Sequence, residues 1–297
     1  MTGHSRVLIF ANPIAGRGLG GKIARRLQSA MTGRGFAVHT FLQRADRLAD
    51  DELRREASAV VVIGGDGTLR SVADRLVAVQ NFAPLLPVPL GTANLMGRHL
   101  GIHWNQHNLE TEVVAAVERH HIVNIDAARA NDRLFLLMTG VGFDAFIVHE
   151  LDRLRKGPIN YLSYLLPTAQ ALKDYRFGPL RVTLDGNEVF DDGPALAFVG
   201  NIPEYGTGFP VLPFARADDG LLDLCVLPCR TAEDLARLFL LSAAGEHTRA
   251  EGVIYRKGKS IRIESPGPVP VQIDGDPAGH TPVQIDLLPV RVPFIVP

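Results

Sequence analysis

A glycine-rich turn with an acid inside it is the segment whose residue types most directly indicate chemistry. The turn reads Gly64-Gly65-Asp66-Gly67-Thr68, follows the apolar run 59–63 and precedes residues 69–76, whose apolar spacing is helical. This pattern predicts a buried strand, a tight turn and a helix. Main-chain N–H groups at such a helix start bind phosphate. Because a carboxylate beside phosphates repels them unless a cation or a donor intervenes, the turn indicates a nucleotide polyphosphate handled with a cation, as in a kinase.

A second glycine-rich segment, from Asn12 to Lys22, follows the first apolar run of the chain. Its glycines partly match the dinucleotide-binding and phosphate-loop patterns. Both matches fail in detail, since Ile23 stands where a phosphate loop needs Ser or Thr, and the next predicted strand ends in His39-Thr40-Phe41-Leu42 without the acid that binds a ribose. A plain flexible loop remains an alternative.

The third segment is Pro89-Leu90-Gly91-Thr92-Ala93-Asn94, also at the end of a predicted strand. Thr92 and Asn94 are suited to bind adenosine or phosphate oxygens, and either one could instead be an ordinary helix N-cap. Ligands of open α/β sheets bind beyond the carboxyl ends of the strands. All three segments are predicted at that edge, so one nucleotide could contact all of them.

The elements that must position these segments alternate in the first half of the chain. Strands are predicted over 7–10, 36–41, 60–63 and 87–90, and helices over 22–31, 48–57 and 111–120. Alternation of this kind favours a parallel sheet covered by helices.

The pattern changes to strands and turns near residues 122–130. Strands are predicted over 134–139, 180–184, 195–199, 221–227, 260–264, 269–273 and 283–288, and helices over 158–173 and 232–244. Asp185-Gly186-Asn187 predicts a hairpin. The sequence thus predicts an N-terminal α/β domain over 1–126 and a mostly antiparallel β domain over 127–297, with the residues after Leu288 as a simple chain end.

Composition excludes several classes of protein. The chain has 297 residues, 46% of them hydrophobic, which is enough for a full core. Its formal net charge of −1 argues against a nucleic-acid partner. Two cysteines exclude a disulfide framework and fit a reducing compartment. No leader or membrane span is predicted, so the expected location is the cytoplasm, and any membrane contact is expected to be peripheral, at the inner face.

The motifs in their order resemble the diacylglycerol kinase and sphingosine kinase superfamily, in its soluble bacterial lipid kinase branch. Besides the three segments above, the resemblance rests on Gly140-Val141-Gly142-Phe143-Asp144-Ala145, on Asp218-Asp219-Gly220-Leu221-Leu222-Asp223 and on Asp274-Gly275-Asp276. NAD kinases share the Gly64–Thr68 turn, but their next motif differs from Pro89–Asn94. The resemblance implies a NAD-kinase-like α/β domain that binds ATP and a C-terminal β-sandwich that binds the substrate.

The resemblance also implies roles for individual residues. ATP contacts are expected from Asn12, Pro13, Gly16, Thr40, Gly64, Gly65, Asp66, Gly67, Thr68, Thr92 and Asn94. A structural Mg²⁺ is expected at Asp219, with the carbonyl groups of Arg216 and Leu221 as further ligands. The catalytic residues are expected to be Asp276 as general base, Asp66 at the cation and Asp126 at the domain junction.

The expected activity is therefore ATP-dependent phosphorylation of a hydroxyl group on a diacylglycerol-like or sphingoid lipid. A kinase of the same fold acting on a soluble alcohol such as NAD, and a catalytically weak nucleotide or lipid sensor, remain alternatives. The expected partner is the lipid alcohol itself, and a homodimer stays open. An apolar stripe over 161–166 is expected to belong to the core, with a lipid entrance or a contact with a bilayer as the alternatives.

Four departures from the family pattern bear on these expectations. Relatives usually have Glu where this chain has Asp276. The loss of one methylene shortens the reach of the side chain by about 1.5 Å, and a misplacement of about 1 Å can already lower the rate about a hundredfold. Leu95 replaces an Asp that joins a magnesium–water network. Asp74-Arg75 stands where relatives often have Asn-Gly, and some relatives continue beyond residue 297 into a final helix. Both Asp218-Asp219-Gly220 and Asp274-Gly275-Asp276-Pro277 could also be simple turns.

Overall fold

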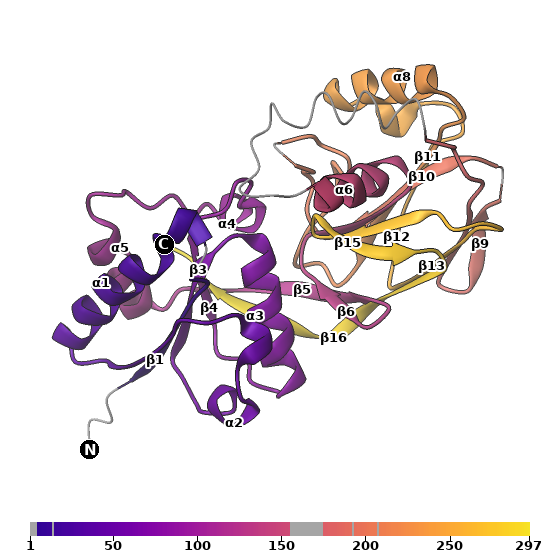
Figure 1. Cartoon of the computed structure of the whole chain (residues 1–297). Helices are drawn as coiled ribbons and strands as arrows, with labels where there is room; N and C mark the ends of the chain where they lie inside the picture. The colour runs from indigo at the N-terminus through magenta and orange to yellow at the C-terminus, as the bar shows by residue number, and fades with distance from the viewer. Residues whose placement is uncertain (1–4, 14, 155–174, 192, 207) are drawn as a thin grey trace. The chain divides into compact units, whose positions relative to one another are not determined.

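The computed structural model describes residues 5–13, 15–154, 175–191, 193–206 and 208–297. The chain forms two compact units (Figure 1): unit 1 contains residues 1–125 and 291–297, and unit 2 contains residues 126–290. Strands β5 (Ile122–Ala130) and β16 (Val283–Ile295) each have residues in both units. The sequence predicts a single boundary after residue 126. It does not predict that residues 291–297 return to unit 1.

Unit 1 contains the parallel sheet that the alternating pattern predicts. Its strands lie in the order β2-β1-β3-β4, and the end of β16 pairs with β4. The bounds are β1 (Arg6–Ala11), β2 (Ala37–Phe41), β3 (Ala59–Gly64) and β4 (Leu85–Pro89). Every residue of β3 is buried, because a central strand of a parallel sheet has helices on both faces.

The helices of unit 1 cover this sheet with amphipathic faces. They are α1 (Gly20–Gly33), α3 (Asp66–Ala78), the short α4 (Leu95–His99) and α5 (Leu109–Arg119). Leu27 and Met31 of α1, spaced by one helical turn, form a core cluster with Val113 of α5 and with β1 and β3. Figure 1 shows α1 and α5 together on one side of the strands and α3 on the other.

The helix predicted over 48–57 is wrong in extent, because α2 covers only Asp50–Leu53. In this segment, side chains from α3 and the residues after it bind main-chain carbonyl groups that a longer helix would pair with its own N–H groups. Arg75 donates to the carbonyl of Leu48 at 2.7 Å, and Asn81 donates to the carbonyl of Leu53 at 2.5 Å. Since these carbonyls are satisfied by side chains, the chain continues without further helical turns.

Unit 2 contains two mainly antiparallel sheets around a shared apolar core, which confirms the predicted β-sandwich. One sheet has the order β12-β11-β10-β7-β14-β15, and the other contains β16, β13, β8 and β9 with β5 and β6. Val199 and Leu224 from the first sheet share the core with Val182 and Ile261 from the second. The remaining strands are β6 (Arg133–Phe135), β7 (Met138–Val141), β8 (Arg181–Leu184), β9 (Asn187–Phe190), β10 (Ala195–Gly200), β11 (Leu222–Pro228), β12 (Ile254–Gly258), β13 (Ser260–Glu264), β14 (Pro270–Ile273) and β15 (Asp276–His280).

The strand predicted over 134–139 is divided into β6 and β7, which belong to different sheets. The break lies where the carboxylate of Asp274 accepts the N–H groups of Leu136, Leu137 and Met138, each at 3.0 Å. The predicted hairpin at Asp185 is confirmed as the β8–β9 connection. Helix α6 (Phe143–Leu154) and strands β12 and β15 were not predicted.

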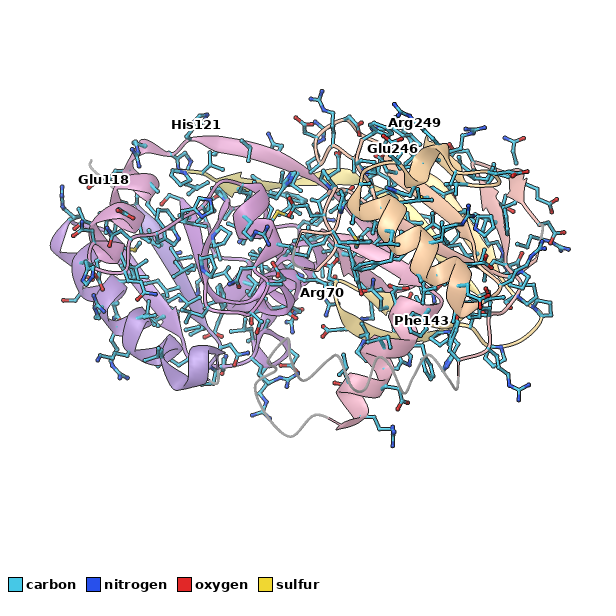
Figure 2. The ribbon with its side chains drawn as sticks, turned by 90° about the horizontal axis from the view of Figure 1, so that it is seen from above. Arg70, Glu118, His121, Phe143, Glu246 and Arg249 are labelled. Carbon is cyan, nitrogen blue, oxygen red and sulfur yellow. The ribbon has the colours of Figure 1, made fainter. Side chains whose placement is uncertain are left out.

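Helix α8 (Ala232–Ala243) confirms the helix predicted over 232–244 and begins with a capping box between Thr231 and Asp234. Figure 2 shows Glu246 beside Arg249 after its end, an exposed ion pair of 2.9 Å. The helix predicted over 158–173 and the apolar stripe over 161–166 lie outside the described residues. Within the described ranges, no helix is long and apolar enough to cross a membrane.

The last residues are not the simple chain end that the sequence predicts. Phe294 and Ile295 are both 0% exposed, and Phe294 is in parallel register with Leu85 of β4. A second main-chain contact is made with another segment of unit 1, because the N–H of Val296 donates to the carbonyl of His121, just before β5. The C-terminal segment therefore completes the core of unit 1.

Replacing Phe294 with Ala is expected to lower the free energy of unfolding by about 3–5 kcal/mol, since it leaves a cavity where a fully buried ring stood. Urea unfolding followed by circular dichroism measures the change. Phe82→Ala is the matched control, because Phe82 is 42% exposed. Equal losses in the two variants would contradict a structural role for the C-terminal segment.

Candidate functional site

Three loops leave the same edge of the sheet in unit 1, because they follow the carboxyl ends of the parallel neighbours β1, β3 and β4. Main-chain hydrogen bonds join them: the N–H of Asn12 donates to Ile63, and the N–H of Leu90 donates to Gly64. The three segments that the sequence singles out are therefore neighbours in space, in the arrangement predicted for a shared ligand.

Two glycines bring the second and third loops into direct main-chain contact. A Cβ on Gly91 would lie 2.7 Å from the Cα of Gly65 and 2.7 Å from Oδ1 of Asn94, and a Cβ on Gly65 would lie 3.1 Å from the Cα of Gly91. Real Cβ atoms do not approach as closely as 2.7 Å, so position 91 requires glycine, and at position 65 a Cβ would be tightly crowded. Gly64 is similarly restricted, because its Cβ would meet the side chain of Thr68 at 2.7 Å.

Asp66 connects these two loops through its carboxylate. It is the first residue of α3, and it accepts the N–H groups of Leu95 at 3.0 Å and Met96 at 3.1 Å, at the start of α4. Burial raises the pKa of Asp66 above its ordinary value, although these hydrogen bonds oppose the rise. Leu95, where the family resemblance led us to expect Asp, contributes its main-chain N–H here, and its side chain is buried.

Asn94 shapes the third loop. It has a φ of 49°, and its amide forms two hydrogen bonds of 2.8 Å with the N–H and the carbonyl of Gly91. The amide expected to contact a nucleotide is thus used by the loop itself, while Thr92 is exposed. Asn94 and Asp66 line a small pocket together with Gly65 and Gly97.

The other predicted ATP contacts lie around these loops. Thr40, near the end of β2, donates to Oε1 of Gln28 at 3.1 Å. Gly16 has a φ of 57°, a left-handed conformation that favours glycine. Pro13 is exposed, whereas Asn12, Gly67 and Thr68 are half-buried.

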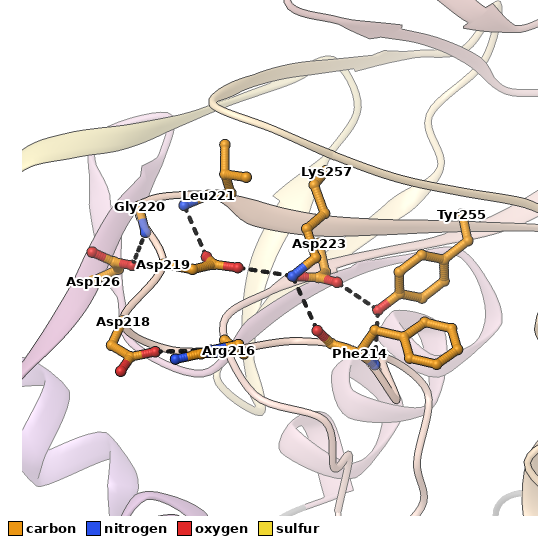
Figure 3. A network of polar contacts seen from close by, with 10 residues as sticks. All are labelled: Asp126, Phe214, Arg216, Asp218, Asp219, Gly220, Leu221, Asp223, Tyr255 and Lys257. Atoms are coloured by element: carbon orange, nitrogen blue, oxygen red, sulfur yellow. Dashed lines mark hydrogen bonds and ion pairs between the residues drawn. The ribbon is translucent and has the colours of Figure 1, made fainter.

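In unit 2, the acidic loop, defined as residues 214–221, contains the residues predicted to bind magnesium (Figure 3). Asp126 is 2% exposed and accepts the N–H of Gly220 at 2.7 Å. Its own N–H donates to the carbonyl of Ala217 at 2.6 Å. Asp126 therefore holds the main chain of the acidic loop in place, which makes it a positioning residue in this geometry.

The carboxylate of Asp219 already has partners on both oxygens. Oδ1 accepts the N–H of Leu221 at 3.1 Å, and Oδ2 accepts Nζ of Lys257 at 2.8 Å (Figure 3). Arg216, whose carbonyl was an expected ligand, pairs its side chain with Asp218 at 3.2 Å. The Lys257 ammonium thus already neutralises Asp219, and its positive charge disfavours a second cation at that carboxylate.

Lys257 also contacts a second carboxylate. Its Nζ lies 3.2 Å from Asp223, which has a fully buried side chain and accepts the hydroxyl of Tyr255 at 2.7 Å. Burial lowers the pKa of Lys257, but the hydrogen bond and charge of Asp219 and the charge of Asp223 outweigh it, so the pKa is raised overall. Lys257 therefore stays protonated at neutral pH. Among the residues that the structure describes, no group of three or more His, Cys, Asp or Glu side chains is arranged to hold a metal.

The two acids of the Asp274-Gly275-Asp276 motif have different surroundings. Asp274 has a φ of 49°, and its carboxylate is held by the three N–H groups described above, which gives it a structural role in the turn. Asp276 is the first residue of β15, and its carboxylate lies 3.9 Å from Nη2 of Arg133. Arg133 is fixed in turn by a 2.6 Å hydrogen bond to the carbonyl of Pro277.

A further acid, Asp144, lies in the first turn of α6 within the glycine motif of unit 2. Burial raises its pKa to about 7, against a smaller opposing effect from a hydrogen bond donated by Gln272 at 3.2 Å. A Cβ on Gly140 would overlap its carboxylate. The glycine at position 140 therefore makes room for a buried acid that titrates near neutral pH.

Known protein families account for this arrangement of two units. The model of the diacylglycerol kinase catalytic domain matches residues 6–130, and the model of the YegS C-terminal NAD kinase beta sandwich-like domain matches residues 138–296. The chain belongs to the diacylglycerol kinase family. This confirms the resemblance and the fold class that the sequence predicts, and it places the protein among kinases.

Relatives within the diacylglycerol kinase family are similar over almost the whole chain. The diacylglycerol kinase of Staphylococcus carnosus is 27% identical over 94% of this chain and 91% of its own. That of Mycobacterium tuberculosis is 27% identical over 98% of this chain and 95% of its own. A solved diacylglycerol kinase structure from Bacillus anthracis has a TM-score of 0.73 and 27% identity, covering 100% of this chain and 98% of that one.

Sequence reasoning missed Lys257, Tyr255 and Asp223 as a group. The available signal was the alternation Tyr255-x-Lys257, which places both side chains on one face of a strand. Because no strand was predicted over the residues of β12, the alternation was not recognised as placing these two side chains on one face. Arg133 was missed as well, since 144 residues separate it from the carbonyl of Pro277 that it binds.

Replacing Gly91 with Ala is expected to lower the free energy of unfolding by about 1–3 kcal/mol, because the new methyl group would overlap the main chain of Gly65. Gly33→Ala is the control, since its Cβ would meet nothing within 4 Å. Thermal unfolding measures both variants. Equal stability of the two would contradict the close contact between the loops.

The Asp144 carboxyl is expected to make the fold less stable as pH rises from about 4 to about 7. Its pKa is near 3.8 in the unfolded chain and about 7 in the fold, so only the folded protein holds the proton across this window. Asp144→Asn cannot ionise, so its unfolding free energy relative to wild type is expected to increase over the same window. Urea unfolding from pH 4 to pH 8 tests this, and a constant difference would contradict it.

Proposed function

We propose that the protein is an ATP-dependent lipid kinase that phosphorylates a hydroxyl group of a diacylglycerol-like or sphingoid lipid. The observation that carries the proposal is the contact between Gly65 and Gly91, with Asp66 bridging the two loops at the carboxyl edge of the sheet. This contact holds the two neighbouring loops side by side, so that one ligand can contact the main chain of both. The names of the relatives, diacylglycerol kinases, support the class of acceptor.

The first turn of α3 is the proposed phosphate site. This turn carries the positive end of the helix dipole, and the N–H of Thr68 within it donates to the carbonyl of Gly65 at 3.0 Å. A Mg²⁺ ion bound with the nucleotide would neutralise charge on the phosphate oxygens. Asp66 is compatible with such an ion, because a carboxylate has about four lone-pair positions and main-chain N–H groups occupy two of them here.

Asp276 is the proposed general base that accepts the proton of the lipid hydroxyl. Its carboxylate is 41% exposed, and Arg133 lies on one side of it. The guanidinium of Arg133, 3.9 Å away, is the charged group beside this carboxylate, and we assign Arg133 the role of a positioning residue.

Because the acceptor is a membrane lipid, the proposal includes a peripheral contact with the membrane face where that lipid resides. The test is incubation of the purified protein with Mg·ATP and a panel of diacylglycerols, sphingoid bases, NAD and polyols, followed by mass spectrometry. Phosphorylated lipid is the expected product. Phosphorylated NAD or polyol alone would instead establish a kinase of soluble alcohols, and no product from any acceptor, with ATP binding intact, would indicate a sensor.

Asp276→Asn is expected to lower kcat about 10²–10⁴-fold with the preferred lipid while leaving ATP affinity unchanged, since it removes only the proton acceptor. Asp276→Glu keeps the carboxylate and is expected to retain more activity than Asp276→Asn. Asp51→Asn, at an exposed position of α2, is the control. Wild-type kcat in Asp276→Asn would show that Asp276 is not the base.

A further inference from the structure

The ammonium group of Lys257 lies within hydrogen-bonding or ion-pair distance of three oxygen atoms from different parts of unit 2. These are Oδ2 of Asp219 at 2.8 Å, the carbonyl oxygen of Phe214 at 3.0 Å and Oδ2 of Asp223 at 3.2 Å. An ammonium group has three N–H bonds and no acceptor; it donates hydrogen bonds to Asp219 and Phe214 and forms an ion pair with Asp223. Figure 3 shows the three contacts converging on Nζ.

The fold brings this group into place through strand register. Lys257 of β12 lies directly opposite Asp223 of β11. Tyr255, two residues earlier, lies on the same face of β12. Asp219 and the carbonyl of Phe214 come from the acidic loop. The lysine therefore connects two paired strands to the acidic loop, which Asp126 also holds, through the N–H of Gly220.

The same oxygens are of the type that a divalent cation selects. Mg²⁺ binds carboxylate and carbonyl oxygens and requires near-octahedral geometry at about 2.0–2.1 Å. In this chain, one oxygen of Asp219 is held by Lys257 and the other by the N–H of Leu221. A divalent ion at Asp219 would lie beside the positive charge of a hydrogen-bonded ammonium group that belongs to the protein, and the two cations would repel each other.

We propose that the Lys257 ammonium is the resident cation of the acidic loop and takes the place of a divalent metal at Asp219. Its charge neutralises one of the two carboxylates and its tether to β12 keeps it in position, so the order of the acidic loop does not depend on divalent cations. This inference concerns unit 2 alone and does not depend on the proposed lipid kinase activity.

The first test measures the cation requirement of the nucleotide-free protein. Thermal unfolding of wild type and Asp219→Asn is followed in EDTA and in excess MgCl₂, and Mn²⁺ binding is counted by electron paramagnetic resonance. We expect the two proteins to bind the same number of Mn²⁺ ions and to show the same difference in Tm between EDTA and MgCl₂. A stabilisation by Mg²⁺, or a bound Mn²⁺, that is present in wild type and lost in Asp219→Asn would overturn the proposal.

The second test removes the ammonium group while keeping most of its apolar stem. Lys257→Met is expected to lower Tm in EDTA by roughly 3–6 °C, the shift that corresponds to one or two kcal/mol in a protein of this size. It is also expected to gain a Mn²⁺ ion that the double variant Lys257→Met, Asp219→Asn does not bind. Lys259→Met, at an exposed position two residues along the chain, is the matched control and should match wild type in both measurements.

Failure of folded Lys257→Met to bind more Mn²⁺ than wild type would overturn the idea that the ammonium occupies a metal position. If Lys257→Met does not fold, the comparison of wild type with Asp219→Asn still decides the question, because it needs no change at residue 257.

Discussion

The candidate nucleotide site depends on one close contact, the approach of the main chain at Gly65 to that at Gly91. Only glycines permit this distance, and Asp66 maintains it by accepting two N–H groups from the start of α4. The glycine turn and the third loop are thereby held as one surface, although 26 residues separate these glycines in the sequence. This surface is ordered before a ligand arrives, which would preorganise the phosphate site proposed at the N-terminus of α3.

The same device recurs at four acids that the sequence singled out. Four aspartates accept N–H groups of loops or helix starts: Asp66, Asp126, Asp219 and Asp274. A carboxylate that accepts such bonds stabilises a turn that lacks regular partners. The acids of this protein therefore support the architecture of its loops, and Asp276 stands apart because its neighbour in the structure is a guanidinium.

Sequence reasoning performed well where structure is local. The strands β1, β3 and β13, the Asp185 hairpin and α8 follow from apolar periodicity, turn chemistry and a capping box over a few residues. It failed where a distant side chain decided the outcome. The helix predicted over 48–57 is shortened where Arg75 and Asn81 bind its carbonyls, and the strand predicted over 134–139 is broken by Asp274. Phe294 was dismissed as chain end because nothing local shows that it pairs with β4.

By itself, the sequence determined the order of the motifs, the alternation of strands and helices, and the glycines that bring two loops together. These features belong to short segments, whose hydrogen bonding and backbone freedom are set by neighbouring residues. Only the tertiary structure decided which charge meets which. Lys257 lies 38 positions from Asp219 and joins it through the register of β11 and β12. Long-range pairing of this kind produces no periodic pattern in the sequence, because it depends on how whole strands align.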